Sequence, residues 1–225
     1  MKKELFQIEN KEQEPKKVIV EIGPGDRSLI WRMARTETEV SYGTGEESLF
    51  KIKPGDTFIE VDLPPERSVD VFRRQIRGQE ENWYKSGKLE SHLKDLKKEL
   101  DEQLPKGAKG EVLHADGQKL PFEDGSIDVI FMANVLGGHV KDDKMLGFEV
   151  GQKRIFREKE NLIKEARRVL RVGGKLIIEE EYAPAESVNF VWDKIMKDLE
   201  KKDSGFRLRD LTEAKEIFTL ELTKI

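Results

Sequence analysis

The sequence predicts an α/β fold with a doubly wound, mostly parallel sheet, and three observations support this prediction. The apolar, β-branched run over residues 18–22 ends in a glycine turn, Gly23-Pro24-Gly25, which leads into a helical segment. Strand-like runs and helical patterns then alternate along the chain, as is typical of parallel strands joined by crossover helices. The length of 225 residues suits one domain with helices on both faces of the sheet. Ligands of such sheets bind at the carboxyl ends of the strands.

Seven stretches have the β-branched or alternating pattern of strands and are bounded by turn signals. Apolar residues at helical spacing predict helices between them, and Gly173-Gly174 is expected to end one of these helices. The polar stretch 35–56 carries the turn signals of a short hairpin. The strands are expected at residues 18–22, 57–61, 111–115, 127–132, 175–180, 206–209 and 218–223, and the helices at 28–34, 153–170 and about 185–202.

The chain is expected to form one domain with a tail and an insert. Residues 1–17 are polar and carry Pro15, which predicts an N-terminal tail before the domain at 18–225. Residues 67–104 are expected to form a long, charged, largely helical insert after the second strand, broken near Gly87. An insert of this length suits a lid or an arm.

Composition excludes several classes of protein and site. Lys and Arg total 41 against 45 Asp and Glu, so the formal charge of −4 gives no overall attraction to nucleic acid. The absence of cysteine excludes disulfides, thiolate metal sites and a cysteine nucleophile, and it fits a reducing compartment. The first residues lack the apolar run of a signal peptide, and no stretch approaches the ~20 apolar residues of a membrane span. We therefore expect a soluble, cytoplasmic protein.

Three acids lie at the carboxyl ends of three consecutive predicted strands: Glu21, Asp62 and Asp116. In a doubly wound sheet they converge beside the turn at Gly23 and Gly25, where missing Cβ atoms let a ligand approach the backbone. Carboxylates repel a polyphosphate, but they accept hydrogen bonds from ribose hydroxyls and from an exocyclic amine. This arrangement predicts a nucleoside ligand without phosphates. Each acid also fits a simpler role as a solvated loop carboxylate, a helix cap or a turn residue.

Longer sequence blocks carry a family resemblance. They read V-I-V-E-I-G-P-G at 18–25, L-P-F-E-D-G-S-I-D-V at 120–129, V-L-G-G-H at 135–139 and R-V-L-R-V-G-G-K-L at 168–176. Together and in this order, they resemble class I S-adenosylmethionine-dependent methyltransferases over about residues 18–181. The second and fourth blocks are the most specific, and they are similar to the subgroup that includes the ubiquinone and menaquinone biosynthesis methyltransferases.

The resemblance implies a Rossmann-like methyltransferase fold with its last strand antiparallel, and S-adenosylmethionine as the methyl donor, released as S-adenosylhomocysteine. It also implies roles on the methionine side of this cofactor. Glu21 would support the glycine loop and the methionine amino group, while Gly23 and Gly25 would pass close to the methionine part. Asn134, just after the fourth strand, would lie beside the methionine and the methyl group.

On the adenosine side, the resemblance implies that Asp62 holds the ribose and that Asp116, with the Gly117 amide, reads the adenine. The chain departs from the family pattern in two places. Arg27 stands where many members have a third glycine, and the stretch between the glycine turn and Asp62 is long. These departures leave Glu60 as an alternative ribose acid.

The chemistry that the resemblance implies is in-line displacement of an activated methyl group, for which placement of the acceptor is the main requirement. His139 is the candidate catalytic base for a hydroxyl or carbon acid, because an unperturbed histidine titrates near pH ~6.5. The alternative is an exposed histidine after a Gly-Gly turn, with no catalytic role. Residues 133–135 provide no acidic cluster, so a metal-dependent transfer is not expected.

The acceptor is expected to be a small organic molecule framed by the inserts at 67–104 and 137–151, whose apolar residues suit either a pocket or docking of the inserts. An RNA methyltransferase is one alternative, because basic runs occur at 73–77 and along the predicted helix from 153 to 168. A non-catalytic S-adenosylmethionine-binding partner subunit is another, with the 67–104 insert as its docking element. The sequence leaves the acceptor atom and the oligomeric state open.

Overall fold

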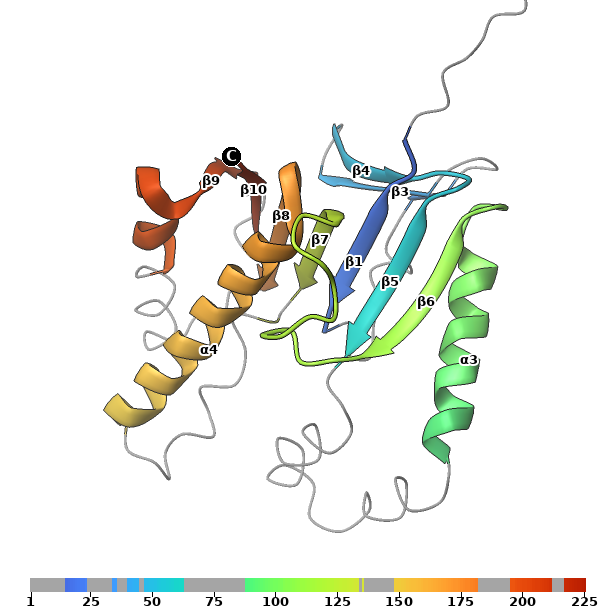
Figure 1. Cartoon of the computed structure of the whole chain (residues 1–225), viewed down its shortest axis with the longest axis horizontal. Coiled ribbons are helices and arrows are strands. Elements are labelled where there is room, and N and C mark those ends of the chain that lie inside the picture. Colours follow the sequence, from blue (N-terminus) through green and yellow to red (C-terminus); the bar gives the residue numbers. More distant parts are fainter. Residues whose placement is uncertain are drawn as a thin grey trace, which may run out of the picture.

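A computed structural model of the chain describes residues 15–23, 34–35, 40–44, 47–62, 88–133, 135, 148–181, 195–211 and 217–225. Its centre is a seven-stranded sheet with the strand order β6-β5-β1-β7-β8-β10-β9 (Figure 1). The strands are β1 (Val18–Ile22), β5 (Thr57–Asp62), β6 (Lys109–His114), β7 (Ile127–Ala133), β8 (Leu170–Glu181), β9 (Phe206–Asp210) and β10 (Ile217–Lys224).

The pairing of these strands confirms the predicted sheet. From β6 to β8 all neighbouring strands are parallel, whereas β10 is antiparallel to both β8 and β9. The strand β1 lies between β5 and β7, with Val20 in register with Ile59 of β5 on one side and Ile130 of β7 on the other. The chain leaves β1 towards β5 and β6 first and reaches β7 only afterwards, so the strand order reverses at β1. Ligands of open α/β sheets bind at the carboxyl ends of the strands beside such a reversal.

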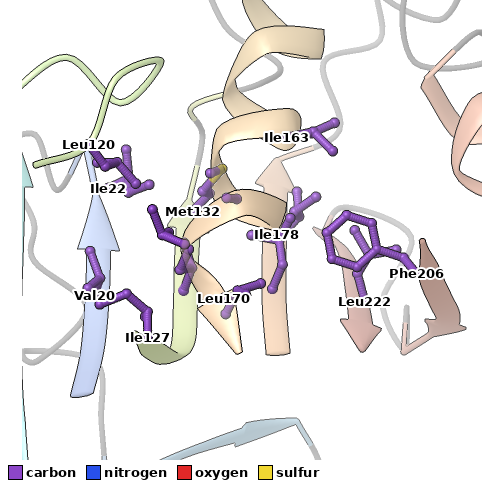
Figure 2. Close-up of a cluster of buried hydrophobic side chains, with 14 of the residues drawn as sticks. Val20, Ile22, Leu120, Ile127, Met132, Ile163, Leu170, Ile178, Phe206 and Leu222 are labelled. Atoms are coloured by element: carbon purple, nitrogen blue, oxygen red, sulfur yellow. The ribbon is translucent and has the colours of Figure 1, made fainter. Parts of the chain in front are cut away.

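One face of the sheet packs against α4 (Phe148–Val169), whose C-terminal end lies beside β8 (Figure 1). Alternate residues of the strands point to this face, because successive side chains of a strand lie on opposite sides. Ile163 and Ala166 of the helix complete the contact. We call this cluster the α4 core, and Figure 2 shows many of its members. It includes Val20, Ile22, Ile59, Val61, Ile130, Met132, Ile163, Ala166, Leu176, Ile178, Leu220 and Leu222.

The opposite face is covered by a second, smaller sheet and by α3 (Lys88–Gln103). The small sheet is antiparallel and consists of β2 (Ala34–Arg35), β3 (Val40–Thr44) and β4 (Glu47–Ile52). The ring of Phe50 in β4 lies against Phe131 of β7, with ring centroids 6.5 Å apart. We call this cluster the β4 core. It comprises Ile19, Phe50, Ile52, Phe58, Leu100, Leu104, Val129, Phe131 and Ile177.

The polar stretch after the first strand contains more strand than the sequence predicted. The expected hairpin within 35–56 is confirmed by β3 and β4, which pair in antiparallel register. The helix expected to end at Ala34 is wrong at that residue, because Ala34 pairs with Ser41 in β2. The rest of that predicted helix, residues 28–33, lies outside the described residues. A turn-rich polar segment thus supplies apolar positions to a core only after it folds onto the main sheet.

The sequence predicted that Gly173-Gly174 ends the preceding helix, and this prediction is wrong. The helix stops at Val169, and β8 begins at Leu170 and runs through both glycines. Pairing with β7 shifts register here, which makes a local irregularity, and Gly173 adopts a φ of +78°. A Cβ on Gly174 would approach the carbonyl oxygen of Arg171 to 2.9 Å. The glycines therefore allow β8 to bend onto β7 immediately after the helix.

The predicted insert and closing elements are described in part. The helix α3 confirms that the insert is helical after Gly87, and residues 63–87 lie outside the described residues. The same holds for the tail residues 1–14 and for residues 182–194 of the last predicted helix, while residues 195–199 are helical. In the part of the chain that the structure describes, no helix is both long and apolar enough to cross a bilayer.

Candidate functional site

Gly23, the residue that follows β1, lies between the ends of the two strands that flank β1. Gly23 has a φ of +67°, and its amide donates a 2.8 Å hydrogen bond to the carbonyl of Val61 in β5. A Cβ at this position would lie 3.0 Å from Cγ2 of Val135, which follows β7. Both the positive φ and this close approach favour glycine. Gly23 therefore lies where β1, β5 and β7 end.

The acids expected after the second and third strands lie at the same edge of the sheet. Asp62 is the last residue of β5, and its backbone pairs in register with His114, the last residue of β6. Asp116 follows two residues later and forms a turn. Its Oδ1 accepts a 3.0 Å hydrogen bond from the Gln118 amide, and its carbonyl accepts one of 2.7 Å from the Lys119 amide. The alternative role of Asp116 as a turn residue is thus confirmed, and the residue lies at the edge where the parallel strands end.

Gly117 is buried between the helix and the first strand. A Cβ on Gly117 would come within 2.7 Å of Cδ2 of Leu162 in α4 and 3.0 Å of Cγ2 of Ile22 in β1. The backbone after β6 can therefore pack against α4 this closely only without a side chain at this position. The packing of α4 thereby determines where the Asp116-Gly117 pair lies.

Two residues of α4 bind the segment that begins at Asp116 and ends at Gly125. We call this segment the 116–125 loop. Arg168 makes a two-pronged ion pair with Glu165, with Nε to Oε2 at 2.9 Å and Nη2 to Oε1 at 2.7 Å. The same guanidinium donates to the loop carbonyls of Leu120 at 3.1 Å and Phe122 at 3.0 Å, and to Oδ1 of Asp124 at 2.5 Å. The Leu120 amide donates back to Oε1 of Glu165 at 2.7 Å. The loop is therefore attached to the helix by charge-assisted hydrogen bonds, which are stronger than neutral ones.

These contacts shift the proton affinities of both side chains. The hydrogen bond from Arg168 is the main cause that lowers the pKa of Glu165; partial burial acts in the opposite direction, and the bond from the Leu120 amide adds to the lowering. The pKa of Arg168 is raised by its hydrogen bonds to Glu165 and Asp124. Each partner thus favours the charged form of the other.

Buried carboxylates line the carboxyl half of the sheet on the β4 side. Glu21 of β1 and Glu60 of β5 are neighbours in register and are 1% and 4% exposed. Glu179 occupies the corresponding face of β8 and is also buried. On the α4 side, burial lowers the pKa of Lys159, while the charges of Glu180 and Glu158 raise it. Buried carboxylates therefore lie on both faces of the sheet, and on the α4 face Glu180 is accompanied by the buried cation Lys159.

The structure brings Glu21, Gly23, Asp62, Asp116 and Gly117 to one edge of the sheet. Three predicted site residues, Gly25, Asn134 and His139, lie outside the described residues, as does the side chain of Asp62. Sequence reasoning missed Glu165 and Arg168, since Arg168 was counted in a basic run. Their three-residue spacing on a helix signals an ion pair, but only the fold brings the 116–125 loop against it.

Comparison with known families identifies the chain. The sequence profile described as a methyltransferase domain matches residues 39–178, which is more than half of the 225 residues. The chain belongs to this methyltransferase family. It is a class I S-adenosylmethionine-dependent methyltransferase, as its sequence blocks predicted, and its cofactor is S-adenosylmethionine. The matched region begins after β1, so the glycine turn lies outside it.

A comparison with solved structures matches several proteins whose titles describe methyltransferases. A protein titled a SAM-dependent methyltransferase from Aquifex aeolicus is 18% identical, with 93% of this chain and 84% of that chain covered and a TM-score of 0.47. One from Methanosarcina mazei is 15% identical, with coverages of 93% and 92% and a TM-score of 0.40. A Pyrococcus horikoshii protein is 12% identical, with coverages of 96% and 85% and a TM-score of 0.47. No curated protein matches the chain.

The residues of this methyltransferase fit its cofactor chemically. The ribose hydroxyls and the adenine amine are hydrogen-bond donors, and the carboxylates at the strand ends are acceptors. The sulfonium is a cation, which buried acids such as Glu21 and Glu60 favour over an anionic phosphate. The bare backbone at Gly23, with its positive φ, permits close approach of a ligand.

Proposed function

We propose that this methyltransferase transfers a methyl group to a small organic acceptor by in-line displacement. When bound, S-adenosylmethionine supplies a methyl group already activated on a sulfonium. The protein therefore has to bind and orient the two reactants and exclude water, and placement supplies much of the rate. The observation that carries the proposal is the edge of the sheet where β1, β5, β6 and β7 end, which combines buried acids with Gly23 at a positive φ.

The cofactor roles of the chain follow from positions along this edge. Asp62, at the end of β5, accepts hydrogen bonds from the ribose hydroxyls, and Asp116 with the Gly117 amide binds the adenine. The placement of the Gly23 turn beside Val61, directly before Asp62, supports this assignment. On the methionine side, the contacts come from Glu21, Gly23, Gly25 and Asn134.

The charge of the described residues favours a small acceptor over RNA. Binding to phosphates requires free Lys and Arg side chains on a surface. Two basic residues of the predicted run are engaged by other parts of the chain: Lys159 is only 5% exposed, and the half-buried Arg168 binds the 116–125 loop. The buried acids Glu21, Glu60 and Glu179 near the same edge would repel a phosphate backbone.

His139 is proposed as the general base when the acceptor is a hydroxyl or a carbon acid. Its place in the sequence, shortly after β7, supports this role, since β7 ends at the ligand-binding edge. We expect His139→Asn to lower kcat on such an acceptor at least tenfold while leaving cofactor affinity unchanged. An unchanged kcat would exclude a base at this position.

The proposed function is tested by transfer of labelled methyl groups to a cell lysate. Purified protein and methyl-labelled S-adenosylmethionine are added, and the products are separated into small-molecule, RNA and protein fractions. We expect label in the small-molecule fraction. Label in RNA would contradict the proposed acceptor class, and no transfer in the presence of cofactor binding would favour a non-catalytic partner subunit.

The ribose role of Asp62 is tested separately by calorimetry. Asp62→Ala should weaken S-adenosylhomocysteine binding by about 1.5–3 kcal/mol, the scale of losing charge-assisted hydrogen bonds. The control is Asp203→Ala, which removes an exposed acid from the 3-10 helix η3 (Lys202–Ser204). Equal affinity of the Asp62 variant and the wild type would reject the assignment, and Glu60→Gln would then be the next variant to measure.

A further inference from the structure

One stripe of α4 faces the 116–125 loop. Asn161, Leu162, Glu165 and Arg168 are spaced so that they share one side of a helix. Each contacts the loop. Asn161 donates a 3.2 Å hydrogen bond to the Gln118 side chain, and Leu162 packs closely against Gly117.

The polar end of this stripe, Glu165 and Arg168, binds both carbonyl and amide groups of the loop backbone. Arg168 donates to two carbonyls of the loop, and Glu165 accepts from the Leu120 amide. The main-chain carbonyl of Arg168 also accepts a 3.0 Å hydrogen bond from the Gly125 amide at the far end of the loop. The chain between Gly117 and Gly125 is therefore attached to α4 at several points along its length.

Ordering a loop before its ligand arrives lowers the entropy cost of binding. We propose that Glu165 and Arg168 are positioning residues for the cofactor: they hold the 116–125 loop so that Asp116 and the Gly117 amide are placed to bind the adenine. The inference rests on the proposed adenine roles of Asp116 and Gly117. Neither positioning residue contacts the cofactor in this account.

A purely structural ion pair would stabilise the fold without affecting the ligand. The two roles are separated by measuring cofactor affinity on folded protein, together with amide hydrogen exchange of the loop. Arg168→Met removes the guanidinium donors to the loop, whereas Arg168→Lys keeps the charge but loses the planar fork. Glu165→Gln keeps the shape of the side chain but removes its charge.

We expect Arg168→Met and Glu165→Gln to weaken S-adenosylhomocysteine binding at least tenfold by calorimetry, and Arg168→Lys to restore part of the loss. Amides of residues 118–125 should exchange faster in the unliganded variants than in the wild type. The matched control is Lys164→Met. It breaks an exposed ion pair on the same helix, in which Lys164 Nζ lies 2.7 Å from Oε1 of Glu160. It should stay within twofold of wild-type affinity.

The outcomes separate this inference from the proposed function. A wild-type protein that binds no S-adenosylhomocysteine would overturn the proposed cofactor site itself. Wild-type binding with unchanged affinity in Arg168→Met and Glu165→Gln would overturn only the positioning role. If Arg168→Met does not fold, the same comparison is made between Glu165→Gln and Lys164→Met, and equal affinities there overturn the inference.

Discussion

The two faces of the central sheet share the same strands but differ in chemistry. On the β4 face, Ile19, Phe58 and Ile177 are followed two residues later by Glu21, Glu60 and Glu179, which lie on the same face and are buried. On the α4 face, β1 and β5 stay apolar through Ile22 and Val61, and among β1, β5 and β8 the one strand that carries a buried acid there is β8, whose Glu180 lies close enough to Lys159 of α4 to raise the pKa of that lysine.

This difference shows how one sheet can combine a rigid support with a polar ligand-binding edge. The apolar α4 face fixes a long helix, and that helix binds the 116–125 loop through Glu165 and Arg168. The β4 face becomes acidic only towards the carboxyl ends, where the ligand-binding edge lies. Its cover is a small sheet together with α3, so a helix is not the only element that can bury the second face.

The largest expected effect tests whether the two cores are equally essential. Ile177 and Ile178 are adjacent in β8, fully buried, and on opposite faces. We expect either alanine variant to lower the free energy of unfolding by about 2–5 kcal/mol, because each leaves a cavity in a packed core. Urea denaturation measures this loss. Val172→Ala, an exposed position of the same strand, should change stability by less than about 0.5 kcal/mol. If Ile177→Ala lost less than about 1 kcal/mol while Ile178→Ala lost the expected amount, the β4 core would contribute less to stability than the α4 core.

The next effect concerns the turn that joins β4 to β5. Buried Asp56 accepts hydrogen bonds from the backbone amides of Lys17, at 2.9 Å, and Lys53, at 2.8 Å. Asp56→Ala leaves both amides without this acceptor, so we expect a loss of about 2–3 kcal/mol in unfolding free energy. Asp56→Asn should lose less because it keeps a carbonyl acceptor. Equal stability of all three proteins would mean that this carboxylate does not hold the small sheet to the start of β1.

The smallest effect is a pH dependence confined to the α4 face. The pKa of Glu165 is lowered in the folded protein, so its stabilising contribution is complete above the unfolded value near 4.5. The contribution is lost as the pH falls below that value and through the folded pKa. The difference in unfolding free energy between wild type and Glu165→Gln should therefore shrink as the pH falls below about 4.5. A difference that stays constant from pH 7 to pH 3 would contradict the ion pair with Arg168.

Most strands were predicted correctly because each has a local pattern that does not depend on its neighbours. The run at 18–22 matches β1 residue for residue, and the run at 127–132 lacks only Ala133. The helix predicted over 153–170 begins earlier, at Phe148, because its first turns lack the apolar spacing of the rest. Gly173-Gly174 was misassigned because glycines end helices and also permit irregular strands, and only pairing with β7 decides between them.

By itself, the sequence determined the order of the strands along the chain, the acids at their carboxyl ends and the methyltransferase family. These features are local or carried by contiguous blocks. The tertiary structure alone decided that a polar hairpin covers one face of the sheet, and that Arg168 donates hydrogen bonds to the 116–125 loop. The physical reason is distance along the chain: Arg168 and Leu120 are 48 residues apart, and no local pattern encodes a contact made only by folding.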